Sequence, residues 1–430
     1  MEYDVVIIGA GPAGYVSAIR SGQLGHKTLV IEKDNVGGMC LNWGCIPSKS
    51  LIESAKMYKK TASLKSYGID GVDLSLLSFN WQNAVKKALG VKQQLSKGIK
   101  YLLRKNGVEI LYGTAIVASS NSIIVNDKKI TASKIIIATG SYPEQGNNNE
   151  IEIKDFYSLP ELPKKLVFCG HGPVAIELAQ MSSLVGSEVY LLTDENNLVP
   201  GLDNYINDFI KQKLKKDKIK IIAGVDDIPD DAVIVNSRMR KAIVPESKIN
   251  IKLDKNGFID TDYKFKTSAK NIYAIGDVNG KSHYAHAGSA QGLFVINNLD
   301  GVNGILDLRK YPVNVYTYPE IAQIGMTESD LEKEGYDYKI SSFPLKANGK
   351  ALINGDTEGE ARILYETRFG EVLGVQIIAE NASDMIAEAS AYMHLEATIY
   401  DVASTIHAHP TVSEIFMEAG FEAVDKAIHK

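Results

Sequence analysis

Residues 5–14 read Val-Val-Ile-Ile-Gly-Ala-Gly-Pro-Ala-Gly, and this stretch decides the fold. The apolar run has the length of a strand, and Gly9, Gly11 and Gly14 follow it at once. In such a turn the first glycine permits the tight bend, the second lets a pyrophosphate approach the backbone, and the third lets helix and strand pack closely. The helix that follows turns the positive end of its dipole toward the phosphates. The stretch therefore predicts a dinucleotide-binding turn.

The residues that follow complete a β-α-β unit. Residues 15–24 are compatible with a helix, and residues 28–31 read Thr-Leu-Val-Ile, a second strand that ends at Glu32. Glu32 lies 18 positions after Gly14, where an acidic side chain accepts hydrogen bonds from a ribose. A glycine turn without a ligand is the alternative. The order of strand, turn, helix, strand and acid favours dinucleotide binding.

A second copy of this pattern occurs further along the chain. Its turn carries Gly170 and Gly172, with Ala175 at the third glycine position. The acid expected at the end of the next strand falls on Thr193, with Asp194 after it, and no arginine cluster suited to a 2′-phosphate is nearby. This turn either binds a nicotinamide cofactor or is a structural β-α-β unit without a ligand.

The stretch between these units carries two of the three cysteines. Residues 37–49 read Gly-Gly-Met-Cys-Leu-Asn-Trp-Gly-Cys-Ile-Pro-Ser-Lys, so Cys40 and Cys45 stand five positions apart. In an ideal helix such residues have Cα atoms about 8–9 Å apart. A disulfide needs roughly 4.4–6.8 Å. A bond between them therefore requires a distorted turn, which Gly44 and Pro47 permit.

Redox chemistry is the interpretation that we favour for this cysteine pair. A bridge across so short a span adds little stability, and three cysteines are not a secreted disulfide framework. A metal site would need further ligands, and Cys169 is the only other thiol. Two unpaired structural cysteines remain an alternative. Because the pair follows the first turn closely, it can lie beside the nucleotide, which points to flavin as its electron partner.

Residues 38–49 resemble the active-site signature of the pyridine nucleotide–disulfide oxidoreductases, in the form found in dihydrolipoamide dehydrogenases. The resemblance covers nearly the whole chain, including residues 273–277 and 316–320. It implies that Cys45 lies against the flavin of a bound FAD and that Cys40 exchanges with the substrate thiol. It also implies that Lys49 lies near the reactive flavin nitrogen, paired with Glu177.

The same resemblance supplies further expected cofactor contacts, among them Asp277 at the ribitol. With the first turn and Glu32, the expected FAD-binding positions are Gly9, Gly11, Gly14, Gly38, Lys49, Ala115, Thr139, Gly140, Gly276, Asp277 and Ala285, and Gly170 and Gly172 are expected to bind the nicotinamide cofactor.

A histidine-rich stretch near the C-terminus completes the expected site. Residues 407–414 read His-Ala-His-Pro-Thr-Val-Ser-Glu and resemble a second signature of the family. Histidine can take a thiol proton near neutral pH, and the resemblance makes His409 the base and Glu414 its partner. A capping box from Thr411 to Glu414, opening a helix near 412–428, is the alternative. We expect His407 to be structural.

These motifs predict an α/β fold with two doubly wound nucleotide-binding domains and a C-terminal α+β dimerisation domain. We expect an FAD domain over 1–146, a second nucleotide-binding domain over 147–247, a segment completing the FAD domain over 248–311 and an interface domain over 312–430. Within this plan, residues 46–106 look helical. Residues 313–316, 362–365 and 372–378 suggest an antiparallel sheet, with helices at 384–395 and 412–428.

Composition limits the partners. The chain has 430 residues, a net charge of −5 and no long basic run, which argues against nucleic acid or an anionic membrane. No segment approaches the roughly 18 apolar residues of a spanning helix, and the first residues lack the positive region of a secretory signal. We therefore expect a cytoplasmic protein without a metal. The family resemblance adds the expectation of a homodimer that acts on a lipoyl-bearing protein or a small dithiol.

We therefore expect an FAD-dependent enzyme that oxidises protein-bound dihydrolipoamide and passes the electrons to NAD or another acceptor. The acceptor is open because residues 236–240 lack the glycine and proline that the family has there, and the second domain looks trimmed. Three electron acceptors remain open, namely NAD(H) that binds weakly, NADP(H) and a different carrier. A glutathione-reductase-like enzyme, a flavin-bearing redox sensor without efficient nicotinamide turnover and a non-flavin NAD-binding structural protein are the alternative functions. Mercuric and large thioredoxin reductases need later cysteines that this chain lacks.

Overall fold

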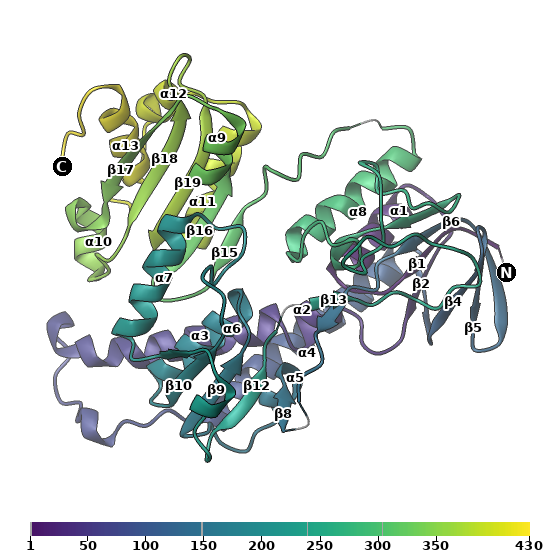
Figure 1. The fold of residues 1–430 in the computed structure, drawn as a ribbon, viewed down its shortest axis with the longest axis horizontal. Coiled ribbons are helices and arrows are strands. Elements are labelled where there is room, and N and C mark those ends of the chain that lie inside the picture. Colours follow the sequence, from purple (N-terminus) through teal and green to yellow (C-terminus); the bar gives the residue numbers. More distant parts are fainter. Residues whose placement is uncertain (1, 148, 239, 303) are drawn as a thin grey trace. The chain divides into compact units, whose positions relative to one another are not determined.

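A computed structural model of the protein describes residues 2–147, 149–238, 240–302 and 304–430 (Figure 1). The chain forms two compact units. The first comprises Met1–Leu51, Asn80–Leu162 and Val235–Leu308, and the second comprises Ile52–Phe79, Pro163–Ile234 and Arg309–Lys430. The domain boundaries expected at 146, 247 and 311 stay predictions.

The first unit is built on a mainly parallel sheet. Its parallel strands lie in the order β3 (Glu109–Tyr112), β2 (Thr28–Glu32), β1 (Glu2–Ile8), β6 (Lys128–Ile137) and β14 (Ile272–Ala274). Ile8 lies opposite Ile31 and Ile137 at the carboxyl ends of the three central strands. Loops that follow parallel strands meet at this edge, where doubly wound folds bind their ligands.

The long strand β6 joins the parallel sheet to an antiparallel extension. Its first residues pair with β5 (Ser122–Val125), which pairs with β4 (Ala115–Ser119). A separate two-stranded ribbon is formed by β7 (Ser141–Pro143) and β13 (Arg240–Ala242). Two short elements, β8 (Glu150–Glu152) and α5 (Ile153–Phe156), follow β7 in the chain, and β8 pairs with β12 (Val233–Asn236) rather than with this sheet.

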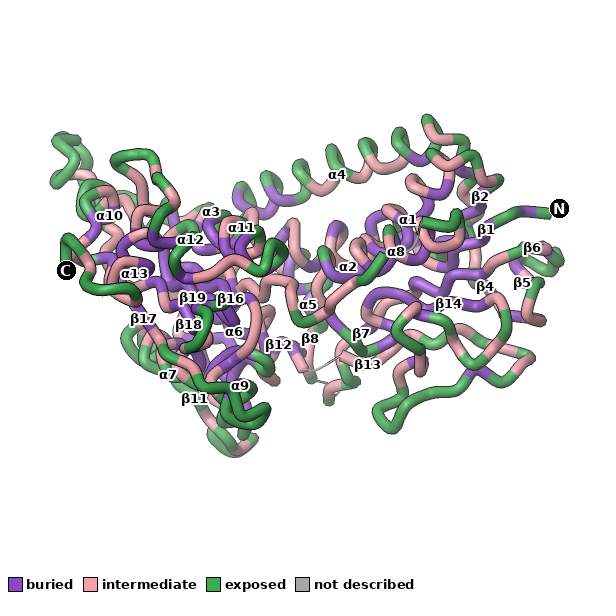
Figure 2. The backbone as a smooth tube through the Cα atoms, turned by 90° about the horizontal axis from the view of Figure 1, so that it is seen from above, coloured by how far each residue is buried: buried purple, intermediate pink, exposed green. Residues whose placement is uncertain are grey.

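Helices α1 (Pro12–Gln23) and α8 (Ala285–Leu299) pack closely in the first unit. A Cβ atom at Gly292 would lie 2.1 Å from Ser17 Oγ, so a larger residue would push the two helices apart. The unit also holds α2 (Gly38–Asn42), the start of α3 (Cys45–Lys60), the long α4 (Trp81–Lys105) and the short turn η4 (Gly276–Asn279). Figure 2 shows that α4 is exposed along much of its length.

The helix expected over 46–106 is interrupted. Residues between α3 and α4 form only the short turns η1 (Thr61–Tyr67) and η2 (Leu74–Leu76). Gly68 and Gly71 have φ values of +75° and +79°, a left-handed conformation that ends helices. Hydrophobicity alone wrongly predicts a helix in this segment, because many of its apolar residues are exposed.

The middle of the chain supplies a second β-α-β unit. Strands β9 (Lys165–Cys169), β10 (Glu188–Leu192) and β11 (Lys220–Ile222) are parallel. Helix α6 (Pro173–Leu184) follows β9, and α7 (Asn204–Lys216) follows β10. Between β11 and β12 (Val233–Asn236) the described residues form the turn η3 (Val225–Asp227) and no strand, so the antiparallel excursion typical of the resembled family is absent here.

The C-terminal residues of the second unit form an antiparallel sheet. Its strands lie in the order β15 (Val313–Val315), β16 (Glu320–Gly325), β19 (Val372–Ala379), β18 (Glu360–Glu366) and β17 (Tyr338–Pro344). The expected strands correspond to β15, β18 and β19, whereas β16 and β17 were not anticipated.

Three helices cover the inner face of that sheet. They are α11 (Ala382–His394), α12 (Ile399–Ser404) and α13 (Glu414–Val424), whose buried residues share one core with the sheet. The short helices α9 (Glu328–Glu334) and α10 (Gly349–Asn354) complete this part. None of the helices in the described ranges is long and apolar enough to cross a membrane.

Candidate active site

The first glycine turn has the shape of a phosphate cradle. Gly9 has a φ of +104°, and a Cβ atom there would lie 2.3 Å from the Ala138 carbonyl oxygen. A Cβ at Gly14 would lie 1.9 Å from the Gly9 carbonyl oxygen, so a glycine is needed for α1 to pack this close. Because α1 begins at Pro12, directly after Gly11, the positive end of its dipole faces the turn.

Glu32 stands at the end of β2, beside the same turn. Its carboxylate is buried and accepts hydrogen bonds from the backbone N–H groups of Ala10 and Asp34, each at 2.8 Å. These bonds use one acceptor position on each oxygen. A carboxylate offers about four such positions, so Glu32 keeps capacity for ribose hydroxyls.

The cysteine segment touches the glycine turn. A Cβ atom at Gly38 would lie 2.6 Å from the Cα atom of Gly11, so these two backbones approach as closely as glycines allow. Gly38 also has a φ of +58°, in the left-handed region that favours glycine. This contact fixes the start of α2, and with it Cys40, next to the phosphate cradle.

The expected distortion between the two cysteines is present. Helix α2 ends at Asn42, and the N–H groups of Trp43 and Gly44 both donate to the Met39 carbonyl oxygen, at 3.0 and 2.7 Å. Helix α3 then begins at Cys45. The break brings the Cys40 and Cys45 side chains into hydrogen-bond contact, with both cysteines in the dithiol form.

The contact between the thiols has an electrostatic consequence. The hydrogen bond with Cys45 and burial both raise the pKa of the Cys40 thiol, and the nearby Lys49 ammonium opposes this rise. Two thiolates so close together would repel each other, so the pair releases its protons one at a time. A pair that holds one proton between two sulfurs is suited to dithiol–disulfide exchange.

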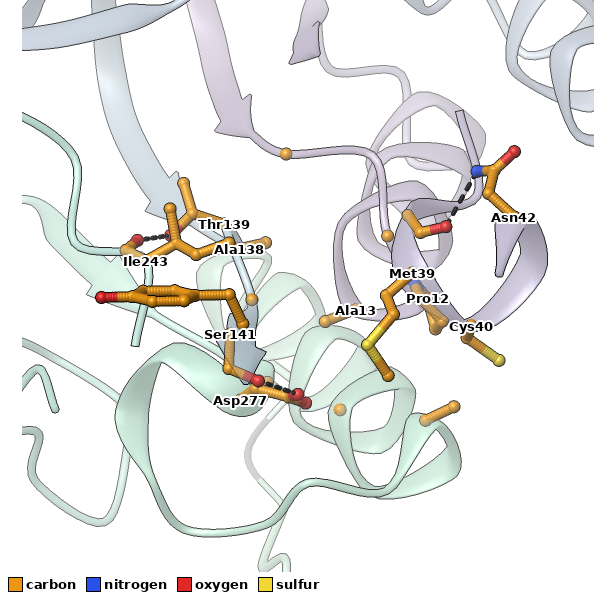
Figure 3. Close-up of a pocket in the computed structure, with 18 of the residues that line it drawn as sticks. Pro12, Ala13, Met39, Cys40, Asn42, Ala138, Thr139, Ser141, Ile243 and Asp277 are labelled. Atoms are coloured by element: carbon orange, nitrogen blue, oxygen red, sulfur yellow. Dashed lines mark hydrogen bonds between the residues drawn. The ribbon is translucent and has the colours of Figure 1, made fainter. Parts of the chain in front are cut away.

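A cavity of about 570 Å³ in the first unit collects these features (Figure 3). Its volume lies within the range of about 300–1,000 Å³ that cofactor sites take. The predicted site residues that line it are Gly9, Gly11, Glu32, Gly38, Cys40, Cys45, Thr139, Gly140, Gly276, Asp277 and Ala285. The two cysteines and the dinucleotide-binding turn thus share one cavity.

Asp277 is the centre of a polar cluster on the cavity wall. Ser141 Oγ donates to its carboxylate at 2.6 Å, Arg240 Nη2 lies 3.2 Å away and His283 Nδ1 lies 3.7 Å away. Burial disfavours the charged carboxylate, but these neighbours outweigh it and lower the pKa of Asp277 to about 2. The carboxylate is therefore ionised at neutral pH.

The cluster leaves a donor for a ligand. Arg240 Nε has no hydrogen-bond partner among the described residues, although it is buried. A buried donor of this kind is normally satisfied, so a polar group of a bound molecule fits this position. The cradle, the acid Glu32 and this wall together suit a dinucleotide such as FAD.

Three predicted FAD-site residues lie outside the cavity lining. Gly14 packs against the Gly9 carbonyl oxygen of the turn, and Ala115 is buried in β4. Lys49 lies on α3 in the first unit, whereas Glu177 lies on α6 in the second. There the Glu177 carboxylate accepts a hydrogen bond from the Tyr316 N–H at 3.0 Å. The pairing of Lys49 with Glu177 stays a prediction.

The second turn has a similar backbone. Gly170 and Gly172 have φ values of +117° and +95°, and α6 begins directly after them at Pro173. At the end of β10, Thr193 is buried and its Oγ1 accepts from the Glu195 N–H. Asp194, the acid that the sequence suggests, is exposed at this edge, as is Glu195.

His409 and Glu414 meet as the sequence predicts. His409 Nδ1 lies 2.9 Å from Glu414 Oε1, while Glu414 Oε2 accepts from the Thr411 N–H at 2.8 Å. The capping-box alternative is wrong in one respect, because α13 begins at Glu414 and Thr411 Oγ1 donates to the Ala408 carbonyl oxygen. One carboxylate thus serves both the histidine and the backbone.

Sequence reasoning missed Ser141, Arg240 and His283. They come from three separate segments that meet at Asp277, so no periodicity or spacing marks them. The available signal was the arginine-rich stretch 236–240, where the family has glycine and proline. Met239, within that stretch, lies outside the described residues.

Comparison with known families matches two models to this chain. The model described as "Pyridine nucleotide-disulphide oxidoreductase" matches residues 3–292. The model described as "Pyridine nucleotide-disulphide oxidoreductase, dimerisation domain" matches residues 311–420. Together they span nearly the whole chain.

Curated relatives of similar length share about a third of the residues. A dihydrolipoyl dehydrogenase of Bacillus subtilis is 33% identical over 475 residues, covering 100% of this chain and 99% of the relative. The dihydrolipoyl dehydrogenase of Mycoplasma genitalium is 33% identical, covering 99% of each. The mitochondrial dihydrolipoyl dehydrogenase 1 of Arabidopsis thaliana is 35% identical, covering 100% of this chain and 92% of the relative.

Solved structures share the fold at lower identity. The crystal structure of LpdA from Mycobacterium tuberculosis superposes with a TM-score of 0.87 at 20% identity, covering 98% of this chain and 99% of that chain. The HOCl-induced flavoprotein disulfide reductase RclA of Escherichia coli gives 0.83 at 23% identity, with 96% and 98% covered.

Proposed function

Because the chain belongs to the pyridine nucleotide-disulphide oxidoreductase family, we propose that it is an FAD-dependent enzyme that oxidises protein-bound dihydrolipoamide to lipoamide. The observation that carries this proposal is the Cys40–Cys45 pair on the wall of the cavity formed at the glycine turn. Relatives named dihydrolipoyl dehydrogenase, matched along their whole length, support the choice of substrate over a glutathione-reductase-like activity.

The residues of the first unit would hold the FAD. The N–H groups at the start of α1 would face its pyrophosphate, Glu32 would accept from a ribose, and Asp277 with Arg240 would face the ribitol region. When bound, the flavin accepts the electron pair collected by the cysteines and passes it to a second acceptor.

The chain's own residues account for the thiol chemistry. With Cys40 and Cys45 joined as a disulfide, His409 takes a proton from one substrate thiol. The resulting thiolate attacks Cys40 Sγ, the Cys40–Cys45 bond breaks, and Cys45 leaves as a thiolate. The second substrate thiol then attacks the mixed disulfide, and its S–H proton passes to Cys40 as the bond between Cys40 and the substrate breaks, so one substrate proton ends on His409 and the other on Cys40. The substrate has lost two electrons and two protons, and the cysteine pair has gained the electrons.

A homodimer completes the proposed site. The C-terminal residues match a dimerisation domain, and in our proposal they present His409 of one subunit to the cysteines of the other. The substrate is then a lipoyl group carried by a protein, or a small dithiol that resembles it.

The nicotinamide acceptor in this proposal is NAD. Asp194 at the end of β10 provides an acid for a ribose 2′-hydroxyl, and residues 193–201 contain no lysine or arginine for a 2′-phosphate. Titrating the reduced enzyme separately with NAD⁺ and NADP⁺ while recording flavin absorbance tests this. We expect NAD⁺ to reoxidise the flavin at lower concentration. A preference for NADP⁺, or no reoxidation by either, would overturn the assignment.

The catalytic role of the cysteines is tested by Cys45→Ser, with Cys169→Ser as the matched control. Cys45→Ser should retain bound flavin and lose dihydrolipoamide turnover, whereas Cys169→Ser should keep both. Retained turnover in Cys45→Ser would refute the assignment. Absence of turnover in the wild-type flavoprotein would favour the redox-sensor alternative, and a colourless wild-type protein would favour the non-flavin one.

A further inference from the structure

The loop that carries His409 connects α12 to α13, and its residues 405–413 are exposed or partly exposed. His409 itself has 79% of its side chain exposed, and its Nδ1 atom lies 2.9 Å from Glu414 Oε1. Two residues earlier, His407 has only 6% of its side chain exposed. The buried histidine is therefore one of the residues that attach this loop to the rest of the C-terminal sheet and helices, together with Thr411, whose carbonyl oxygen accepts from Asn348 Nδ2 at 3.1 Å.

Both ring nitrogens of His407 face hydrogen-bond acceptors. Nδ1 lies 3.0 Å from the Thr405 carbonyl oxygen, and Nε2 lies 2.7 Å from Glu388 Oε1 on α11. A backbone carbonyl can only accept. A neutral imidazole has one N–H, whereas an imidazolium has two and can donate to both partners at once.

Glu388 is suited to hold a cation. The same Oε1 atom also accepts from the hydroxyl of Tyr392 at 2.5 Å. Burial and the bond to Glu388 raise the pKa of Tyr392, so the tyrosine remains a donor. The ring of His407 and the hydroxyl of Tyr392 thus both face this one carboxylate oxygen.

Negative charges on neighbouring helices also favour the protonated ring of His407. The bond to Glu388 raises the pKa of His407, burial opposes this, and the charge of Glu388, the Thr405 carbonyl and the charge of Glu414 add to the rise. Glu388 belongs to α11 and Glu414 to α13, so both helices packed near the ring contribute negative charge.

We propose that His407 is a positioning residue that, as a buried imidazolium bonded to Glu388 and Thr405, fixes the loop on which His409 approaches the substrate thiol. This inference rests on the proposed function for the role of His409, but not for the charge of His407. Loss of one proton would remove one of the two bonds and loosen the loop at the end that follows α12, while the bond from Asn348 to Thr411 remains. The loop is then fixed below the raised pKa of His407 and loosened as the pH rises through it.

The charge of His407 is tested in the holoenzyme by NMR of ¹⁵N-labelled histidine side chains between pH 5.5 and 9. His407→Gln identifies the signals by their loss. We expect His407 to remain doubly protonated through neutral pH and to titrate above about 6.5, the ordinary histidine value. A single neutral tautomer at pH 7 would overturn the proposal.

The positioning role is tested by hydrogen exchange and kinetics. His407→Gln is compared with His429→Gln, which removes a similar pair, His429 Nδ1 to Glu418 Oε1 at 2.7 Å, elsewhere in the same unit. We expect backbone exchange of residues 405–413 to be faster by about tenfold or more in His407→Gln only. The kcat for dihydrolipoamide should fall ~10- to 100-fold, as expected for a displaced catalytic group, with little change in KM.

A third variant tests the positioning role if His407→Gln folds poorly. Glu388→Gln removes the charge that holds the imidazolium, so kcat should fall as the pH rises through about 6.5, a decline that the wild type shows only at higher pH. If His407→Gln and Glu388→Gln both show the backbone hydrogen exchange and the pH profile of the wild type, the positioning role is refuted. If the wild type does not turn over dihydrolipoamide, the proposed function fails, while the NMR and exchange results still decide the role of His407.

Discussion

At the scale of single residues, Glu414 shows how one carboxylate organises the candidate base. Its Oε1 lies against His409 Nδ1 and its Oε2 accepts from the Thr411 N–H. The imidazole is thereby oriented with Nδ1 toward the carboxylate, which leaves Nε2 to take a proton. The backbone bond also lowers the pKa of Glu414, although burial opposes this, and His409 lowers it further.

We therefore predict that Glu414→Gln slows dihydrolipoamide oxidation by roughly 100-fold, because an amide does not support the imidazolium that forms. Steady-state kcat measures the effect. Glu418→Gln, which alters the His429 pair instead, is the control and should stay near the wild-type rate. Equal rates for both variants would remove Glu414 from the mechanism.

Asp277 offers a second residue-scale prediction, based on charge. Its pKa is lowered to about 2, so it contributes stability that is present above its unfolded value of about 3.9 and is lost as the pH falls toward 2. Asp277→Asn leaves Arg240 without its carboxylate. We expect a loss of about 2 kcal/mol in the free energy of unfolding of the apoprotein at pH 7.

Urea unfolding at pH 7 and at pH 3 checks this prediction. The difference in the free energy of unfolding between the wild type and Asp277→Asn should be largest at pH 7 and smaller at pH 3. At pH 3 the Asp277 carboxyl is protonated in the unfolded state, so the folded state gains less from holding it ionised. A difference that is the same at both pH values would show that the charge of Asp277 contributes nothing.

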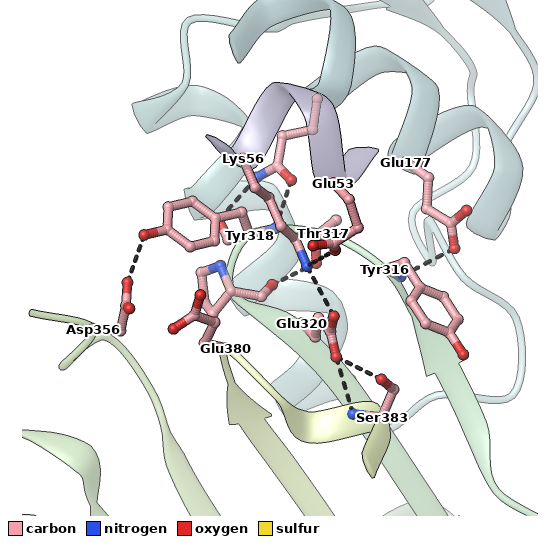
Figure 4. A network of polar contacts seen from close by, with 12 residues as sticks. Glu53, Lys56, Glu177, Tyr316, Thr317, Tyr318, Glu320, Asp356, Glu380 and Ser383 are labelled. Carbon is pink, nitrogen blue, oxygen red and sulfur yellow. Dashed lines mark hydrogen bonds and ion pairs between the residues drawn. The ribbon is translucent and has the colours of Figure 1, made fainter. Parts of the chain in front are cut away.

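At the scale of elements, the far end of the cysteine helix is held by a buried ion pair (Figure 4). Lys56 on α3 lies 2.8 Å from Glu320 Oε1 on β16, and both side chains are less than a tenth exposed. The other oxygen of Glu320 accepts from the N–H and hydroxyl of Ser383 at the start of α11. Burial alone would lower the pKa of Lys56, but Glu320 and Glu53 raise it instead.

We predict that Glu320→Gln destabilises the protein by ~3 kcal/mol, because it leaves a buried ammonium without its main counter-charge. The double variant Lys56→Met/Glu320→Leu should lose much less, since it removes both charges together. Thermal unfolding of the holoenzyme measures both variants. A double variant as unstable as the single one would mean that the pair itself, not the unpaired charge, provides the stability.

At the scale of the whole molecule, the proposed mechanism needs residues from both ends of the chain. The cysteines lie near the N-terminus, and His409 lies in the segment that matches a dimerisation domain. In a twofold-symmetric dimer each subunit can supply the cysteines of one site and the histidine of the other. The proposal therefore makes activity a property of the dimer.

We predict that a heterodimer of Cys45→Ser and His409→Gln subunits, purified with two different tags, regains about half of the wild-type kcat, because one of its two symmetric sites is then intact. Each homodimeric variant should be inactive under the same assay. A heterodimer as inactive as its parents would show that His409 serves the cysteines of its own subunit.

Local patterns predicted much of this site from the sequence. Gly9, Gly14 and the break before Cys45 depend on backbone conformation within a few residues, and such requirements leave a direct trace in residue type. The pairing of His409 with Glu414 was expected instead from the resemblance of residues 407–414 to a family signature, and the two side chains meet in the structure. By contrast, the interruption after α3 was missed because exposed apolar residues there imitate the face of a helix.

Glycine spacing and short-range geometry located the nucleotide turn and the cysteine pair, because such requirements are encoded in neighbouring residues. His409 was located by the resemblance of its segment to a family signature. Only the tertiary structure decided what surrounds them. Arg240 and Ser141 meet at Asp277, and Glu388 meets His407, across separations in the chain that no local pattern spans. Such contacts follow from how sheets and helices pack, and their charges set the ionisation of the site.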